Sequence, residues 1–80
     1  MEDVNTLRNR FNTQQREILT SIWRYYLKES RWMPARLLHV TNGSKKAVRP
    51  LIDQLGGSIV YEQEEKGNPY YGLTFLGILL

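Results

Sequence analysis

The sequence predicts one small, mainly α-helical domain that carries a small β-hairpin. Apolar residues recur at helical spacing before residue 57, an extended pattern replaces that spacing after residue 58, and glycine-containing turns separate the segments. The chain has 80 residues and no cysteine, so one core must form from apolar packing alone. We expect a leading helix or arm over residues 1–12, a three-helix core over 13–57, a hairpin over 58–74, and the start of a truncated further element over 75–80.

The strongest helical pattern runs from Gln14 to Glu29, where two adjacent rows of apolar residues follow i, i+4 spacing. The rows are Ile18, Ile22 and Tyr26, and Leu19, Trp23 and Leu27. Asn12 or Thr13 can cap this helix. Asn12 as the cap places Gln15 at the third helical position, where its amide completes a capping box. A shorter leading helix is expected from Val4 to about Arg10.

A second, short helix should follow. Pro34 suits its first position, because the missing N–H of proline has no intrahelical partner there. The helix should run to about Val40 and face inward with Leu37, Leu38 and Val40 itself. His39, the only histidine of the chain, lies in this segment and has no other metal-ligating residues near it in the sequence. We therefore interpret it as a surface or half-buried structural residue.

A third helix should run from Lys45 to about Leu55. Asn42-Gly43 predicts a tight turn before it, since glycine adopts positive φ without steric cost, and Ser44 is a good N-cap. Its inward residues recur at helical spacing and are followed by a pair of C-capping glycines. These residues are Val48, Leu51, Ile52 and Leu55, and the glycines are Gly56 and Gly57.

Pro50 lies inside this third helix. A proline there removes one backbone hydrogen bond and clashes with the carbonyl four residues back, at a cost of ~3 kcal/mol in a regular helix. Two interpretations stay open. The helix kinks near residues 46–50, or the turn over 44–48 is separate and the helix proper begins at Arg49-Pro50.

The last part of the chain predicts a hairpin. Residues 58–63 and 70–73 favour extended chain, and 64–69 supply a charged tip of about six turn-forming residues. Thr74 can cap a final apolar piece over 75–80, which stops without a polar C-terminal turn. We therefore expect an N-terminal domain of a longer protein, a natural terminus tucked into the core being the alternative.

The aromatic residues are expected to serve mainly the core or its rim, although rings of this kind can also stack on single-stranded bases. Trp23 and Tyr26 lie on the apolar stripe of the first long helix. Tyr25 lies off that stripe, and Tyr70 and Tyr71 alternate across a strand, so Tyr25 and one of this pair should reach the surface.

Two stretches carry a resemblance to a known family. Residues 42–55, NGSKKAVRPLIDQL, are similar to the tight turn and recognition helix of winged helix-turn-helix domains. Residues 71–77, YGLTFLG, are similar to the Y-x-L-T-x-x-G stretch that closes the wing in many members. The order of the predicted elements also resembles this superfamily over nearly the whole length of the chain. The resemblance is to the N-terminal domain of a longer bacterial-type protein. The resemblance implies a three-helix bundle plus a wing.

The resemblance also implies a site for duplex DNA, because the recognition helix of DNA-binding members lies in the major groove. The groove-facing positions would be Ser44, Lys45, Lys46 and Arg49, with Arg36 as a flanking phosphate contact. The two lysines can reach phosphates, and the planar fork of Arg49 can face a guanine edge. Ser44 and the free N–H groups behind it can hold one further phosphate.

The charge distribution gives mixed support to DNA binding. Residues 1–50 hold ten Lys and Arg against four Asp and Glu, whereas residues 51–80 hold one Lys against four acids, for a total of +3. A basic half suits an anionic partner. The wing carries Glu62, Glu64 and Glu65 against Lys66, however, and would repel the DNA backbone.

The alternative is a protein-interaction or dimerisation module without DNA binding, since winged helices serve both purposes. The acidic wing, the exposed tyrosines or the apolar C-terminal segment would then dock a partner protein or a second copy. The surface over the third helix separates the two hypotheses. A continuous positive face that includes Arg36 favours nucleic acid, and a face broken by Glu62 or Asp53 favours protein docking.

Other functional classes find no support in the sequence. There is no G-x-S-x-G elbow, no H-E-x-x-H and no P-loop, so we expect neither an enzyme nor a bound cofactor or metal ion. No apolar run is long enough to span a membrane, and the N-terminus lacks the apolar stretch of a signal peptide. We therefore expect a cytoplasmic protein.

Overall fold

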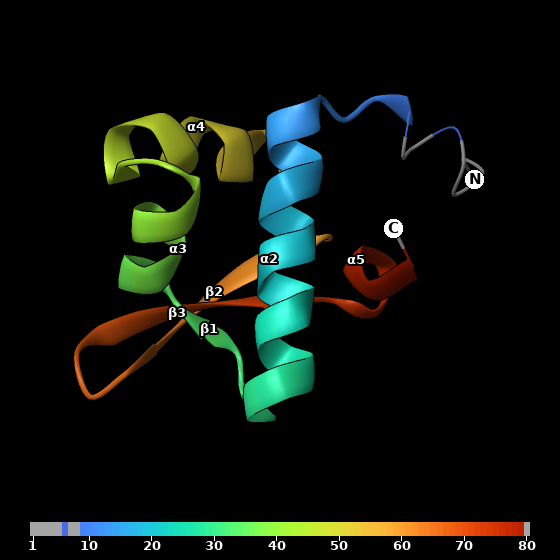
Figure 1. Cartoon of the computed structure of the whole chain (residues 1–80). Helices are drawn as coiled ribbons and strands as arrows, with labels where there is room; N and C mark the ends of the chain where they lie inside the picture. The colour runs from blue at the N-terminus through green and yellow to red at the C-terminus, as the bar shows by residue number, and fades with distance from the viewer. Residues whose placement is uncertain (1–5, 7–8, 80) are drawn as a thin grey trace.

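The computed structural model describes residue 6 and residues 9–79 of the chain. Its elements are α2 (Thr13–Glu29), β1 (Met33–Pro34), α3 (Ala35–Asn42), α4 (Lys45–Leu55), β2 (Val60–Glu65), β3 (Asn68–Leu73) and α5 (Phe75–Leu79). Figure 1 shows α2 at the centre, with α3 and α4 on one side and α5 on the other. The predicted fold class, mainly α with an antiparallel hairpin after the helices, is confirmed. The leading helix expected over 4–10 lies largely outside the described residues.

The predicted capping box at the start of α2 is present. The side chain of Asn12 accepts a hydrogen bond from the Gln15 N–H at 2.7 Å, and the Gln15 side chain accepts one from the Asn12 N–H at 3.0 Å. The same Gln15 amide donates to the Leu51 carbonyl at 3.3 Å and to the Gln54 side chain at 3.1 Å. Gln15 is buried, so this one polar side chain both begins α2 and joins it to α4.

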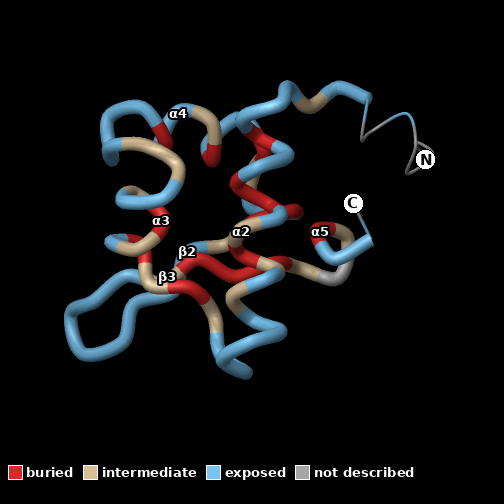
Figure 2. The backbone as a smooth tube through the Cα atoms, in the orientation of Figure 1, coloured by how far each residue is buried: buried red, intermediate tan, exposed pale blue. Residues whose placement is uncertain are grey.

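The core lies between the helices and the sheet. Figure 2 shows buried backbone along α2 and in the parts of β2 and β3 nearest to it, and an exposed hairpin end. The buried apolar residues are Ile18, Leu19, Ile22, Met33, Ala35, Leu38, Val48, Ile52, Leu55, Ile59, Val60, Tyr71 and Leu73. The inward residues predicted for α4 are therefore confirmed, with Leu51 half-buried at the edge.

Several burial predictions for α2 and α3 are wrong at the ends of these helices. Val40 is 84% exposed and Leu27 is 62% exposed, although both were expected to face inward. Tyr25 packs against the core, and Tyr26 is the exposed member of this pair. The buried stripe of α2 follows Gln15, Ile18, Leu19 and Ile22, and continuing that stripe at i, i+3 spacing leads to residue 25.

Pro34 lies one residue outside the helix that it was predicted to begin. It belongs to β1, a two-residue strand that pairs with Tyr70 and Tyr71 of β3, and its extended backbone leads into α3 at Ala35. The helix then continues to Asn42, two residues beyond the predicted end. Gly43, with φ of +121°, ends it by donating its N–H to the His39 carbonyl at 3.2 Å.

The helix α4 has the predicted bounds, from Lys45 to Leu55, with Pro50 inside it. The hypothesis that the helix proper begins at Arg49-Pro50 is therefore wrong. Ser44 caps the helix through its side chain, and its carbonyl accepts from the Val48 N–H at 2.9 Å. Pro50 is exposed, so water can bond the carbonyl that lacks an intrahelical donor.

The sheet has three antiparallel strands in the order β1-β3-β2. The predicted six-residue tip is wrong, because the strands extend until Glu65 pairs with Asn68. The turn itself needs only Lys66 and Gly67, which both have positive φ and so match the twist of a tight hairpin. Pro69 is tolerated in β3 because the short β1 pairs only with the two residues that follow it.

The final helix, α5, begins after Thr74 as predicted. The Thr74 side chain accepts a hydrogen bond from the Gly77 N–H at 3.2 Å and donates to the Ser58 carbonyl at 2.5 Å. A Cβ at Gly77 would lie 2.4 Å from the Ile59 carbonyl oxygen, so only glycine allows α5 to approach the start of β2 this closely. Thr74 and Gly77 together fix the helix against the base of the hairpin.

Candidate nucleic-acid interface

The five residues predicted to contact DNA lie on α3, on α4 and on the turn between them. Arg36 is in the first turn of α3, and Ser44, Lys45, Lys46 and Arg49 follow one another from the N-cap of α4. All five are exposed. The fold brings Arg36, from one of the two predicted segments, close to Lys45 and Arg49 from the other.

A hollow of about 270 Å³ lies between α3, the start of α4 and the hairpin. Arg36, Lys45 and Arg49 line it, together with His39. Ser44 and Lys46 are not among its lining residues and lie at the exposed start of α4 instead. Glu62 from β2 is the carboxylate in this lining. The cations thus share a concave surface, and the hairpin contributes a negative charge to it.

The start of α4 has the features of an anion-binding helix end. The Ser44 hydroxyl accepts from the Ala47 N–H at 3.4 Å, and the N–H groups of Lys45 and Lys46 precede the first intrahelical bond. Partial positive charge from the helix dipole adds to the charge of these two lysines. Within the described part of the chain, no carboxylate pairs with Lys45, Lys46 or Arg36.

Arg49 differs from the other cations because carboxylates already bind it. Its Nη1 donates to Oε2 of Glu62, and its Nε lies 3.3 Å from Oδ1 of Asp53, one turn along α4. The hydrogen bond to Glu62, followed by one to the Tyr71 side chain, raises the pKa of Arg49 above its ordinary value. A guanine edge would have to compete with these two carboxylates for the guanidinium. The positive face over α4 is therefore broken by both acids that were expected to favour protein docking.

Sequence reasoning missed the Arg49–Glu62 pair. Glu62 was interpreted as one of three acids near a repulsive wing tip, whereas it pairs with Tyr71 in the sheet and faces α4. Only the Arg49–Asp53 pair has a sequence signal, the i, i+4 spacing of opposite charges on a helix. Glu64 and Glu65 remain exposed beside Lys66 at the hairpin end, as expected.

His39 is half-buried, as predicted, and lines part of the hollow. Its ring meets that of Tyr71 edge to face, with centroids 6.2 Å apart and planes at 82°. Its Nδ1 is buried without a hydrogen-bond partner in the described structure. Burial, and next the charge of Lys45, lower the pKa of His39 below 6.5. At pH 7 the imidazole is therefore mainly neutral and adds little positive charge to the surface.

Among the described residues, no three His, Asp or Glu side chains gather in a way that would hold a metal ion. No helix in the described part of the chain is both long and apolar enough to cross a membrane. Comparison with protein-family models, curated proteins and solved structures finds no significant match. The arrangement of helices followed by a three-stranded sheet with a hairpin is compatible with winged-helix topology.

Proposed function

We propose that this chain is a winged-helix module that binds duplex DNA mainly through backbone phosphates. The observation that carries the proposal is the group of three exposed cations, Arg36, Lys45 and Lys46, at the start of α3 and α4. None of them has a carboxylate partner within the described structure. Such cations attract phosphates without regard to sequence.

The pairing of Arg49 limits the base readout that this surface can offer. Two carboxylates compete with a base for the guanidinium, so direct recognition of guanine by Arg49 is suppressed. We expect three phosphate contacts and weak discrimination among duplex sequences. With three contacts, the logarithm of the binding constant should fall with the logarithm of salt concentration at a slope of about −2.7.

The test is a titration with a mixed-sequence duplex, followed by fluorescence anisotropy and by the amide signals of residues 44–55. The K45Q/K46Q variant should lower the salt slope to about −0.9. The matched control R24Q/K28Q removes the same charge from the exposed side of α2 and should leave the slope unchanged. The proposal would be refuted if duplex DNA gave no saturable amide shifts at low salt, or if the two double variants reduced the salt slope equally.

Protein docking is the second candidate function, and the broken positive face favours it. The Arg49–Glu62 pair removes one cation from the recognition helix, and the hairpin end carries exposed acids of its own. A protein partner that contacts the hairpin meets carboxylates rather than cations. If protein docking is the function, duplex DNA should not shift the amide signals of residues 44–55, and a protein or peptide partner should shift those of the hairpin.

A further inference from the structure

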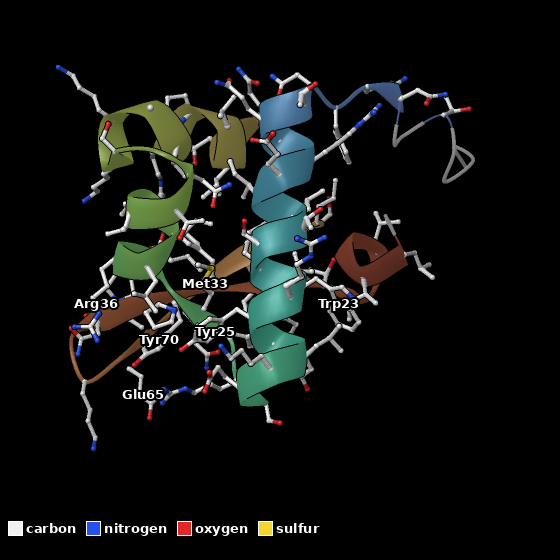
Figure 3. All side chains as sticks on the ribbon, viewed as in Figure 1. Trp23, Tyr25, Met33, Arg36, Glu65 and Tyr70 are labelled. Atoms are coloured by element: carbon white, nitrogen blue, oxygen red, sulfur yellow. The ribbon has the colours of Figure 1, made fainter. Side chains whose placement is uncertain are left out.

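A second groove, of about 500 Å³, lies between the C-terminal end of α2 and the hairpin. Three aromatic residues line it: Tyr26, Trp32 and Tyr70. Its polar lining consists of Ser30, Arg31, Gln63, Glu64 and Glu65. Figure 3 shows Tyr70 and Glu65 close to one another on the hairpin, beside the end of α2. This groove shares only Tyr70 with the hollow of the candidate DNA interface.

The end of α2 holds the aromatic rings in place. Ser30 adopts a left-handed conformation with φ of +58° and donates its N–H to the Tyr26 carbonyl at 2.8 Å, which turns the chain back. Trp32 then stacks on Tyr26, with ring centroids 4.2 Å apart, and meets Tyr61 of β2 edge to face at 6.3 Å. Tyr26 nevertheless remains 36% exposed. These ring contacts hold Tyr26 and Trp32 in position at the end of α2.

The charges around these rings favour a cation. Glu64 and Glu65 are exposed on β2, and Arg31 is the one cation in the described lining. The C-terminal end of α2, at Ser30, adds the partial negative charge of its last carbonyl groups. Aromatic faces attract Lys and Arg side chains, and more strongly where water is displaced. Nucleic acid is disfavoured here, because its phosphates would meet two carboxylates.

We propose that this groove binds a Lys or Arg side chain from a basic segment of a partner protein. The aromatic rings supply cation–π attraction, and Glu65 supplies an ion pair from the edge of the groove. The site does not depend on DNA binding, since it uses none of Arg36, Lys45 or Lys46. Duplex DNA and the partner protein can therefore occupy opposite sides of the hairpin.

The test uses the 80-residue chain and three short peptides in which one central position, flanked by Gly and Ser, is arginine, lysine or citrulline. Citrulline keeps the size of arginine and has no charge. Binding is followed by the indole and amide signals of Trp32 and by the amide of Tyr70. The arginine and lysine peptides should give saturable shifts, and the citrulline peptide should bind at least about fivefold more weakly.

The variants separate the groove from a general effect of charge. E65Q should weaken binding of the arginine peptide by about threefold or more, whereas E17Q, which removes the same charge from an exposed position near the start of α2, should have no effect. Equal binding of the citrulline peptide, equal losses in E65Q and E17Q, or no saturable shift would overturn the proposal. Shifts at Trp32 and Tyr70 produced by single-stranded DNA instead of the peptides would overturn it as well.

Discussion

The substitution E62Q should release Arg49 for contact with DNA. Glu62 is the principal cause of the raised pKa of Arg49, so its removal frees the guanidinium from its strongest partner. One further phosphate contact steepens the salt slope by about 0.9, from about −2.7 to about −3.6. If the non-ionic part of the binding free energy is unchanged, the additional slope of about −0.9 corresponds to an affinity about fivefold higher at 0.15 M salt and about fifteenfold higher at 0.05 M.

Stability should change little in E62Q. The side chains of Arg49 and Glu62 are 45% and 40% exposed, so solvent screens the pair and its loss costs at most about 1 kcal/mol. For a chain of this size that loss lowers Tm by at most about 8 °C. We therefore expect the variant to stay folded, so that its DNA affinity reports on the released guanidinium.

The assay for E62Q is anisotropy of a labelled mixed-sequence duplex between 0.05 and about 0.2 M salt. The control is E64Q, which removes the same charge from the same strand and leaves the partners of Arg49 in place. A slope that stays at the wild-type value in E62Q, or that changes equally in both variants, would refute the release of Arg49. If the wild-type protein binds duplex DNA and E62Q has the same salt slope, the proposal of phosphate binding stands and only the release of Arg49 by E62Q is rejected.

Three further predictions concern the fold. Gln15→Ala should destabilise the domain by about 1–3 kcal/mol in chemical denaturation, because the cap and the link from α2 to α4 are lost together. Gly77→Ala should cost about 1–3 kcal/mol, since its Cβ would meet a backbone oxygen at 2.4 Å, whereas Gly57→Ala, whose Cβ meets nothing within 4 Å, should be neutral or slightly stabilising. NMR titration should give His39 a pKa below 6.5, and Lys45→Gln should move it only part of the way back, because burial is the larger cause. Because its pKa is lowered, His39 binds a proton less readily in the folded protein than in the unfolded chain. The free energy of unfolding should therefore be independent of His39 titration above pH 6.5 and should fall as the pH drops below 6.5. His39→Asn should remove this fall.

The helices were predictable because their end signals are local. Asn12 with Gln15 and Ser44 with Gly56 mark the limits of α2 and α4 through hydrogen bonds within one turn, and short spacings in the sequence reveal them. Burial at the ends of helices was less predictable. Val40 is apolar and lies in a helix, yet its exposure depends on where the neighbouring elements stop, which helical spacing alone does not determine.

The hairpin shows a second limit of local reasoning. The charged and turn-forming composition of residues 64–69 predicts a tip of about six residues, whereas Lys66 and Gly67 alone form the turn. A left-handed lysine is uncommon, so the sequence gives no signal for this tight turn. The strand β1 was missed because two residues carry no alternating pattern, and its existence depends on the partner β3. The site was affected in the same way, since Arg49 and Glu62 meet only once the register of the sheet is known.

Strand alternation gives the acidic residues of the hairpin two separate sets of contacts. Successive side chains of a strand point to opposite faces, so Glu62 and Glu65 lie on different sides of β2. Glu62 faces α4 and neutralises Arg49, while Glu65 lines the aromatic groove at the end of α2. If these acids acted together as one repulsive wing tip, E62Q and E65Q would have similar effects on every ligand. The structure instead leads us to expect that E62Q changes the binding of duplex DNA alone and that E65Q changes the binding of the arginine peptide alone.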